Sequence, residues 1–310
     1  MKINNILGAL AVAICVAGLS ADVWTSSLVV GGRTRDFHLF VPSGYDGHTP
    51  LPLVLVLHGG RGTAEQIENH TGFSSLAEKE RFLVAYPQGI DNQWNDGRQV
   101  KSIKPQQLDI DDVGFISALL EAIGNKYRVD QDRIFATGIS NGGFMSQRLA
   151  CALSDRLAAV ASVAATMPAP LLNECRPAFK VSVLIMNGTD DPLVPYQGGP
   201  VHLGPIVRGR ASSTDETINF WVMFNGCRKY FSTEVDNDPS DSTNIQEDFY
   251  RGLDKPGVEV RLYQIVGGGH TWPGASQYLP KLIIGRISRE INATEAIWEF
   301  FKGHPKVQEP

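Results

Sequence analysis

A tight turn with a serine at its apex is the feature of this sequence that most restricts its fold. The pentapeptide Gly138-Ile139-Ser140-Asn141-Gly142 follows an apolar run, residues 133–137, that is typical of a buried strand. A helical pattern of apolar residues begins directly afterwards, at Phe144. Glycines on both sides of the serine permit a turn in which larger side chains would collide with neighbouring backbone. The sequence therefore predicts a strand, a sharp turn and a helix that expose the Ser140 hydroxyl as a candidate nucleophile.

A serine nucleophile needs a histidine base, and that base needs a carboxylate to orient it. Where the serine lies on such a turn, the acid and then the histidine follow it in the chain. The histidines that follow Ser140 are His202, His270 and His304. We take His270 as the candidate base because it ends a glycine-rich turn after the alternating strand pattern of residues 258–266. His202 lies in a predicted loop and His304 in a polar tail.

The acid should lie between the serine and the histidine, again at the end of a strand. The buried-strand pattern of residues 181–186 is followed by two adjacent aspartates, Asp190 and Asp191. The pattern does not separate them, since one can orient His270 while the other forms a turn with its own backbone.

The oxyanion hole is expected in the loop after an early strand. The apolar run of residues 53–57 ends in His58-Gly59-Gly60-Arg61-Gly62, where glycines let backbone N–H groups approach a substrate closely. Gly60 is the candidate donor, together with the N–H of Asn141, the residue after the nucleophile. His58 precedes Ser140, and we expect it to pin this loop rather than act as the base.

The N-terminal segment predicts export. Residues 1–21 combine a charged start with an apolar run from Ile6 to Val16 and small residues at 17–21, where a signal peptidase would cleave. The apolar run is too short to span a membrane. We expect a secreted or periplasmic protein with one catalytic domain over residues 22–310. The formal net charge of −5 argues against nucleic acid or an anionic membrane surface as the main partner.

Strand and helix patterns alternate along the chain, which predicts a mostly parallel sheet covered by helices on both faces. The stretches 197–213 and 232–247 are expected to be loops. The expected strands lie near 27–30, 36–41, 53–57, 82–86, 133–137, 158–163, 181–186 and 258–266, and the expected helices near 63–79, 112–127, 143–154, 214–225 and 292–302.

Several segments together resemble the secreted esterases grouped as polyhydroxybutyrate depolymerases and feruloyl esterases. The resemblance covers about residues 28–302 and implies the α/β-hydrolase fold, an α/β class with an eight-stranded sheet. The matching segments are Leu57-His58-Gly59-Gly60, Tyr86-Pro87-Gln88-Gly89 with Trp94, Asp111-Asp112-Val113-Gly114-Phe115, Gly138-Ile139-Ser140-Asn141-Gly142-Gly143, the stretch from Asn187 to Tyr196, and Gly267-Gly268-Gly269-His270-Thr271-Trp272-Pro273-Gly274.

The resemblance also implies particular roles for residues. It identifies Ser140, Asp191 and His270 as the catalytic triad, and so selects Asp191 over Asp190. It suggests a disulfide between Cys151 and Cys175. Cys227 has no evident partner, because Gly252-Leu253 stand where members of the family often have a second cysteine.

The leading hypothesis is therefore a serine carboxylic-ester hydrolase that acts through an acyl-enzyme and needs no metal or organic cofactor. A serine peptidase on the same fold is the alternative. A non-catalytic binding module is disfavoured because all three triad residues are present.

The substrate class stays open. The resemblance implies a hydroxycinnamoyl-sugar ester or a hydroxyalkanoate oligomer. Trp94 and Trp272 are candidates for stacking on such a substrate, and are equally suited to a core position. The sequence does not specify the oligomeric state.

Overall fold

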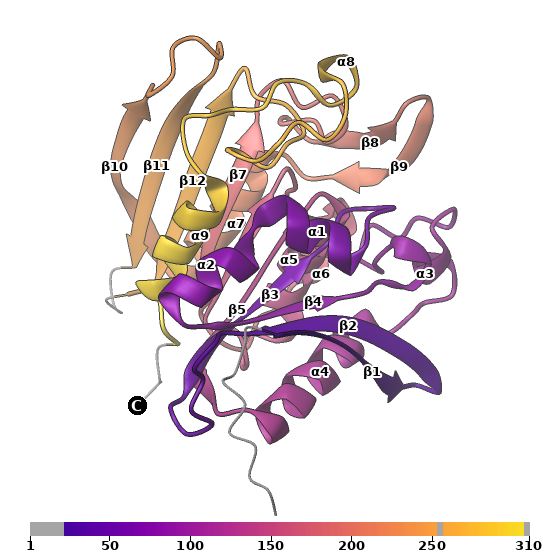
Figure 1. Ribbon diagram of the computed structural model, residues 1–310. Helices are drawn as coiled ribbons and strands as arrows, with labels where there is room; N and C mark the ends of the chain where they lie inside the picture. The colour runs from indigo at the N-terminus through magenta and orange to yellow at the C-terminus, as the bar shows by residue number, and fades with distance from the viewer. Residues whose placement is uncertain (1–21, 253–256, 307–310) are drawn as a thin grey trace, which may run out of the picture.

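A ten-stranded mixed sheet forms the centre of the protein (Figure 1). The computed structural model describes residues 22–252 and 257–306, so the predicted signal peptide lies outside the described residues. None of the helices within these ranges is long and apolar enough to cross a membrane. In spatial order the strands are β1 (Asp22–Val30), β2 (Arg33–Val41), β4 (Leu83–Pro87), β3 (Leu51–Leu57), β5 (Val129–Ile139), β6 (Ala159–Val163), β7 (Ser182–Gly188), β12 (Glu259–Val266), β11 (Asn244–Gly252) and β10 (Cys227–Val235).

The central strands, from β4 to β12, run parallel to one another, whereas β1, β2, β10 and β11 pair with their neighbours in antiparallel fashion. The expected fold class is confirmed, but the expected count of eight strands is wrong. Part of the predicted loop 232–247 belongs to the hairpin β10–β11 at the edge of the sheet. Most side chains of β10 are exposed, so its sequence lacks the apolar pattern of a buried strand.

Helices cover both faces of the sheet and bury two separate cores. Side chains of β3 show the division, because Leu53, Leu55 and Leu57 enter one core while Val54 and Val56 enter the other. The first core includes side chains of α4 (Asp112–Lys126), α5 (Asn141–Ala152) and α7 (Thr214–Asn225). The second includes side chains of α1 (Ala64–Thr71), α2 (Phe73–Glu80) and α9 (Ala293–Lys302).

Two other segments differ from the sequence-based expectation. The single helix expected over residues 63–79 is divided into α1 and α2 at Gly72, whose φ of 68° ends the first helix. The predicted loop 197–213 contains a separate hairpin, β8 (Gly199–Leu203) and β9 (Ile206–Ala211). The remaining short elements are η1 (Ile90–Asn92), α3 (Lys104–Gln107), α6 (Ala169–Glu174) and α8 (Lys281–Ile284).

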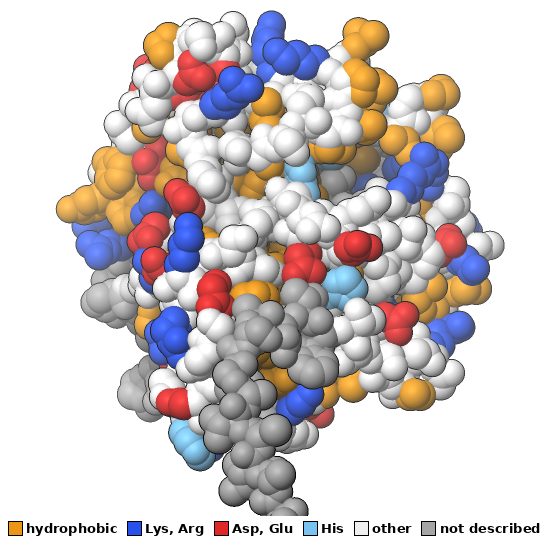
Figure 2. Space-filling model, in the orientation of Figure 1, with side chains coloured by type: hydrophobic (Ala, Val, Ile, Leu, Met, Phe, Trp, Pro, Cys, Tyr) orange, Lys and Arg blue, Asp and Glu red, His pale blue; other side chains and the backbone are white. Residues whose placement is uncertain are grey.

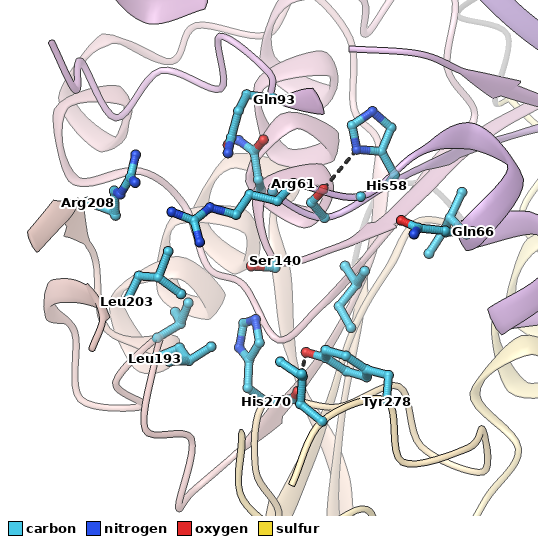
Figure 3. A pocket seen from close by; sticks show the side chains of 18 of the residues that line it. His58, Arg61, Gln66, Gln93, Ser140, Leu193, Leu203, Arg208, His270 and Tyr278 are labelled. Atoms are coloured by element: carbon cyan, nitrogen blue, oxygen red, sulfur yellow. Dashed lines mark hydrogen bonds between the residues drawn. The ribbon is translucent and has the colours of Figure 1, made fainter. Parts of the chain in front are cut away.

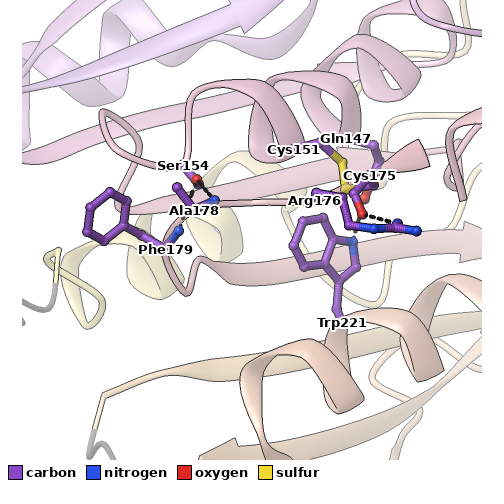
Figure 4. The surroundings of a disulfide bond; sticks show 8 residues. All are labelled: Gln147, Cys151, Ser154, Cys175, Arg176, Ala178, Phe179 and Trp221. Carbon is purple, nitrogen blue, oxygen red and sulfur yellow. Dashed lines mark hydrogen bonds between the residues drawn. A yellow bond between two sulfur atoms is a disulfide. The ribbon is translucent and has the colours of Figure 1, made fainter. Parts of the chain in front are cut away.

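A disulfide joins Cys151 in the last turn of α5 to Cys175, the residue after α6 (Figure 4). Beside it, the Trp221 indole N–H donates to Gln147 of α5 at 2.7 Å. The bridge therefore ties α5, the helix that directly follows Ser140, to the segment between β6 and β7. Among the described cysteines, Cys227 is free.

Reduction of this bridge should lower the thermal stability of the protein. The bond closes a loop of 24 residues, for which chain entropy gives an upper estimate of about 3 kcal/mol. We expect a lower Tm for the paired Cys151→Ser and Cys175→Ser variant and for the wild type in reductant, measured by thermal denaturation.

Cys227→Ser is the matched control, and reductant should lower its Tm as much as that of the wild type. Burial raises the pKa of the Cys227 thiol to about 11, so this thiol should be alkylated slowly at pH 8. Non-reducing peptide maps that link Cys227 to either of the other cysteines would contradict this assignment.

Candidate active site

Ser140 lies at the turn between β5 and α5, in a backbone conformation that few residues adopt. Its φ is 55° and its ψ is −119°. A Cβ atom on Gly142 would lie 2.2 Å from the Leu57 carbonyl oxygen, and one on Gly138 would lie 2.7 Å from the same atom. Both glycines are therefore required for β5 and α5 to pack against the end of β3. The strand, turn and helix predicted from the sequence are all present.

Asp191 and His270 lie on the loops that follow the neighbouring strands β7 and β12. The Asp191 Oδ2 atom is 2.7 Å from His270 Nδ1, and both residues are almost fully buried. Asp191 Oδ1 accepts hydrogen bonds from the N–H groups of Leu193 and Val194. A carboxylate oxygen accepts, so the contact of Oδ2 with His270 fits a donating Nδ1–H. That tautomer leaves Nε2 of the imidazole as an acceptor.

Asp190 has a different environment from Asp191. Its side chain is 60% exposed, and its closest charged neighbour is Arg286 at 3.9 Å. The structure thus brings Asp191, and not Asp190, against His270. Of the other downstream histidines, His304 bonds Glu259 at 3.0 Å. His202, on β8, lines the same cavity as Ser140, but within the described residues its ring does not contact a carboxylate.

Backbone N–H groups in the loop after β3 differ in whether they already have an acceptor. The Arg61 N–H donates to Asn92 at 2.7 Å, and the Gly62 N–H donates to the Gly59 carbonyl at 3.0 Å. The Gly60 N–H has no acceptor within the described part of the chain. Asn141 opens α5, so its N–H also lacks an acceptor within the helix. Both residues line the same cavity as Ser140.

A buried polar network that was not predicted from the sequence holds Asn141 in place. Its side-chain oxygen accepts from the backbone N–H of Trp94 at 2.8 Å, and its side-chain N–H donates to the Asp96 carboxylate. Asp96 also pairs with Arg98 at 2.6 Å, and all of these groups are buried. The Asp96-Gly97-Arg98 segment carries no recognisable motif, so only the fold reveals this support.

His58 holds the loop after β3 in place, as predicted. Its Nδ1 bonds the Gly59 carbonyl at 2.8 Å, and its Nε2 accepts from the Gly89 N–H at 2.9 Å. These partners require a neutral ring with the proton on Nδ1. Burial lowers the pKa of His58 to about 4, which keeps the ring neutral over the ordinary pH range.

Ser140 and His270 open into one cavity of about 720 Å³ (Figure 3). In Figure 3 the His270 ring is turned toward Ser140. Tyr278, which was not predicted, also lines this space and donates its hydroxyl proton to the His270 carbonyl at 3.0 Å. Apolar walls are supplied by Ile67, Ile103, Ile139, Leu193, Val194, Val201, Leu203 and Leu279.

The predicted substrate contacts of Trp94 and Trp272 are wrong. Their exposed fractions are 0% and 1%, and neither lines the cavity. The Trp94 indole N–H donates to the His58 carbonyl at 2.9 Å, and that of Trp272 donates to Thr294 at 3.0 Å. Both are core residues whose polar atoms are satisfied internally.

Comparisons with known proteins point to one family. A sequence profile described as "Esterase PHB depolymerase" matches residues 36–178. NocK of Nocardia uniformis subsp. tsuyamanensis, assigned as an esterase, is 32% identical over 91% of this chain and 84% of its own length. Feruloyl esterase B of Piromyces equi is 31% identical over 74% of this chain and 41% of its own length. Feruloyl esterase C of Emericella nidulans is 28% identical over 86% of this chain and 83% of its own length.

A solved structure confirms the α/β-hydrolase fold. The acetyl xylan esterase from Aspergillus awamori superposes with a TM-score of 0.56, covering 90% of this chain and 99% of that one. The identity between the two chains is 14%, so this likeness concerns the fold alone.

The buried neutral His58 predicts a loss of stability in acid. The unfolded chain takes up a proton near the ordinary histidine pKa of 6.5, whereas the native ring does so only near 4. Between these values the unfolded state binds more protons, so the free energy of unfolding falls as the pH is lowered. The full contribution of His58 is at most about 3 kcal/mol.

Denaturant unfolding at pH 4.5 and pH 7 measures this effect. The difference between the two pH values should be smaller in His58→Gln than in the wild type, because glutamine does not titrate. His48→Gln, at an exposed position, is the control and should keep the wild-type difference. An equal pH difference in all three proteins would contradict the assignment.

Proposed function

Because this chain belongs to the esterase family of the polyhydroxybutyrate depolymerases and feruloyl esterases and is a carboxylic-ester hydrolase, we propose that it acts through a Ser140–His270–Asp191 triad. The observation that carries this proposal is the 2.7 Å contact between Asp191 and His270 at the wall of the cavity that Ser140 lines. The three residues also follow one another in the order that this fold uses.

In the proposed reaction the Ser140 Oγ attacks the ester carbonyl carbon while His270 Nε2 accepts the hydroxyl proton. Asp191 holds the imidazole in the required tautomer and stabilises the imidazolium that forms. The C–O bond of the ester then breaks, and His270 gives its proton to the departing alcohol. Water repeats the same steps on the acyl-enzyme, which releases the acid and restores Ser140.

We assign the stabilisation of the negative charge that develops on the carbonyl oxygen to the N–H groups of Gly60 and Asn141. The unused Gly60 donor and the fixed side chain of Asn141 support this assignment. Removal of one such donor costs about 2.7–4 kcal/mol of activation free energy in a serine protease.

We propose a hydroxycinnamoyl-sugar ester or a hydroxyalkanoate oligomer as the substrate. The feruloyl esterase names of the relatives support the first, and the family description supports the second. A cavity of about 720 Å³ lies within the range of small-molecule sites, about 300–1,000 Å³. We further propose that the protein is secreted or periplasmic, which is consistent with its disulfide.

Ser140→Ala should abolish ester hydrolysis without unfolding the protein. Loss of the serine of a catalytic triad usually lowers kcat by orders of magnitude, and we expect at least about 10³-fold here. Initial rates on 4-nitrophenyl acetate and methyl ferulate, with a Tm for each protein, measure the effect. A folded variant that retains more than about a tenth of the wild-type rate would overturn the assignment. A dipeptide 4-nitroanilide assayed in parallel distinguishes esterase from peptidase activity.

Asp191→Asn should be far more damaging than Asp190→Asn. The amide at 191 would favour the wrong histidine tautomer, a change that costs up to about 10⁴-fold in a serine protease. Asp190 is mostly exposed and does not contact His270, so its substitution is the matched control. The kcat values of the two variants decide the point, and the reverse order would show that Asp190 orients the base.

A further inference from the structure

We propose that Arg208 and Arg61 form a carboxylate-binding subsite in the active-site cavity, so that the preferred ester carries a free carboxylate. This inference rests on the proposed function, because it concerns the substrate of that site.

The charge of the cavity wall differs from that of the whole chain. The chain has a formal net charge of −5, and Figure 2 shows positive and negative side chains interspersed on one face. The described residues that line the cavity, by contrast, include Arg61, Arg98 and Arg208 and no aspartate or glutamate. Asp191 lies behind His270, where its oxygens are already bonded. A substrate therefore meets uncompensated positive charge near Ser140.

Arg98 does not supply this free charge. Its guanidinium pairs with Asp96 at 2.6 Å and lies 4.4 Å over the Phe144 ring. Within the described residues, neither Arg61 nor Arg208 makes an ion pair or donates a side-chain hydrogen bond. Burial lowers the pKa of His70, another lining residue, and so favours its neutral form. Among the arginines of the cavity wall, the unpaired ones are thus Arg61 and Arg208.

Arg208 also carries an unsatisfied polar atom. Its Nε is buried without a hydrogen-bond partner. A buried donor left in this state is costly, and such atoms are few in native proteins. A carboxylate bound in the cavity would accept from the terminal guanidinium nitrogens of Arg208, in the bidentate geometry that arginine favours. Figure 3 shows the guanidinium groups of Arg61 and Arg208 on the same side of Ser140.

The backbone of Arg208 is bonded to the buried polar network that holds Asn141. Its carbonyl accepts from the buried Arg98 guanidinium at 3.0 Å. The next residue, Gly209, has a φ of 85°, and a Cβ there would lie 2.6 Å from a Val100 methyl carbon. The hairpin β8–β9 can approach this closely only with glycine at that position. The network that fixes Asn141 therefore also positions Arg208.

The experiment compares esters that differ only in a carboxylate. One pair is the linear trimer of 3-hydroxybutyrate and the same trimer with its carboxylate converted to a primary amide, which tests the alcohol side of the scissile bond. The other is mono-4-nitrophenyl glutarate and 4-nitrophenyl pentanoate, which tests the acyl side. The ratio of kcat/KM, charged over neutral, is measured for the wild type, Arg208→Gln and Arg61→Gln. Arg210→Gln is the matched control, since Arg210 is an exposed arginine of the same strand outside the cavity.

In at least one pair, the ratio should fall by about tenfold or more in Arg208→Gln and in the same direction in Arg61→Gln. Arg210→Gln should keep the wild-type ratio. An unchanged ratio in both pairs for both variants would overturn the subsite while hydrolysis of the neutral esters upholds the proposed function. If wild-type protein hydrolyses none of these esters, both conclusions fail.

A second measurement does not depend on the folding of a variant. In wild-type protein, raising the salt concentration from 0.02 to 0.5 M should lower kcat/KM for the charged member of the preferred pair and leave the neutral member nearly unchanged. Equal salt effects on both members in both pairs would contradict the subsite.

Discussion

The arrangement of the active site depends on a close backbone contact between three segments. Gly138 and Gly142 bring the ends of β5 and α5 within van der Waals distance of the Leu57 carbonyl at the end of β3. The loop that leaves β3 then lies next to the nucleophile, since a Cβ on Gly59 would lie 3.6 Å from Ser140 Cβ. A larger side chain at either elbow glycine would force these segments apart. The serine and the candidate oxyanion donors are thus positioned by backbone packing and not by flexible side chains.

A second close contact joins the acid to the base. The strands β7 and β12 are parallel neighbours, so the loops after them emerge at the same edge of the sheet. The Asp190 N–H donates to the Gly268 carbonyl at 2.9 Å, and a Cβ on Gly188 would lie 2.2 Å from that oxygen. Backbone contacts therefore hold the two loops together. Asp191 and His270 can then be buried as a pair, with the remaining acceptor of the carboxylate satisfied by backbone N–H groups.

The sequence predicted the central elements because their burial imposes a clear pattern. The strand at residues 53–57 is apolar throughout since both of its faces are covered, and such a run is visible without any structure. The hairpin β10–β11 was missed for the opposite reason. Strand β10 lies at an exposed edge of the sheet, where both of its faces can carry polar side chains. The division of the first helical pattern at Gly72 was also missed, because a single glycine within such a pattern does not reveal its own φ.

For the candidate site, the sequence by itself determined which residue types stand at the ends of which strands. That was enough to name Ser140 and His270 and to limit the acid to Asp190 or Asp191, because topology brings the carboxyl ends of parallel strands together. The family resemblance then selected Asp191. Only the tertiary structure decided which side chains face the cavity. It assigned Trp94 to the core and Arg208 to the cavity wall, since the direction of a side chain depends on packing between segments far apart in the chain.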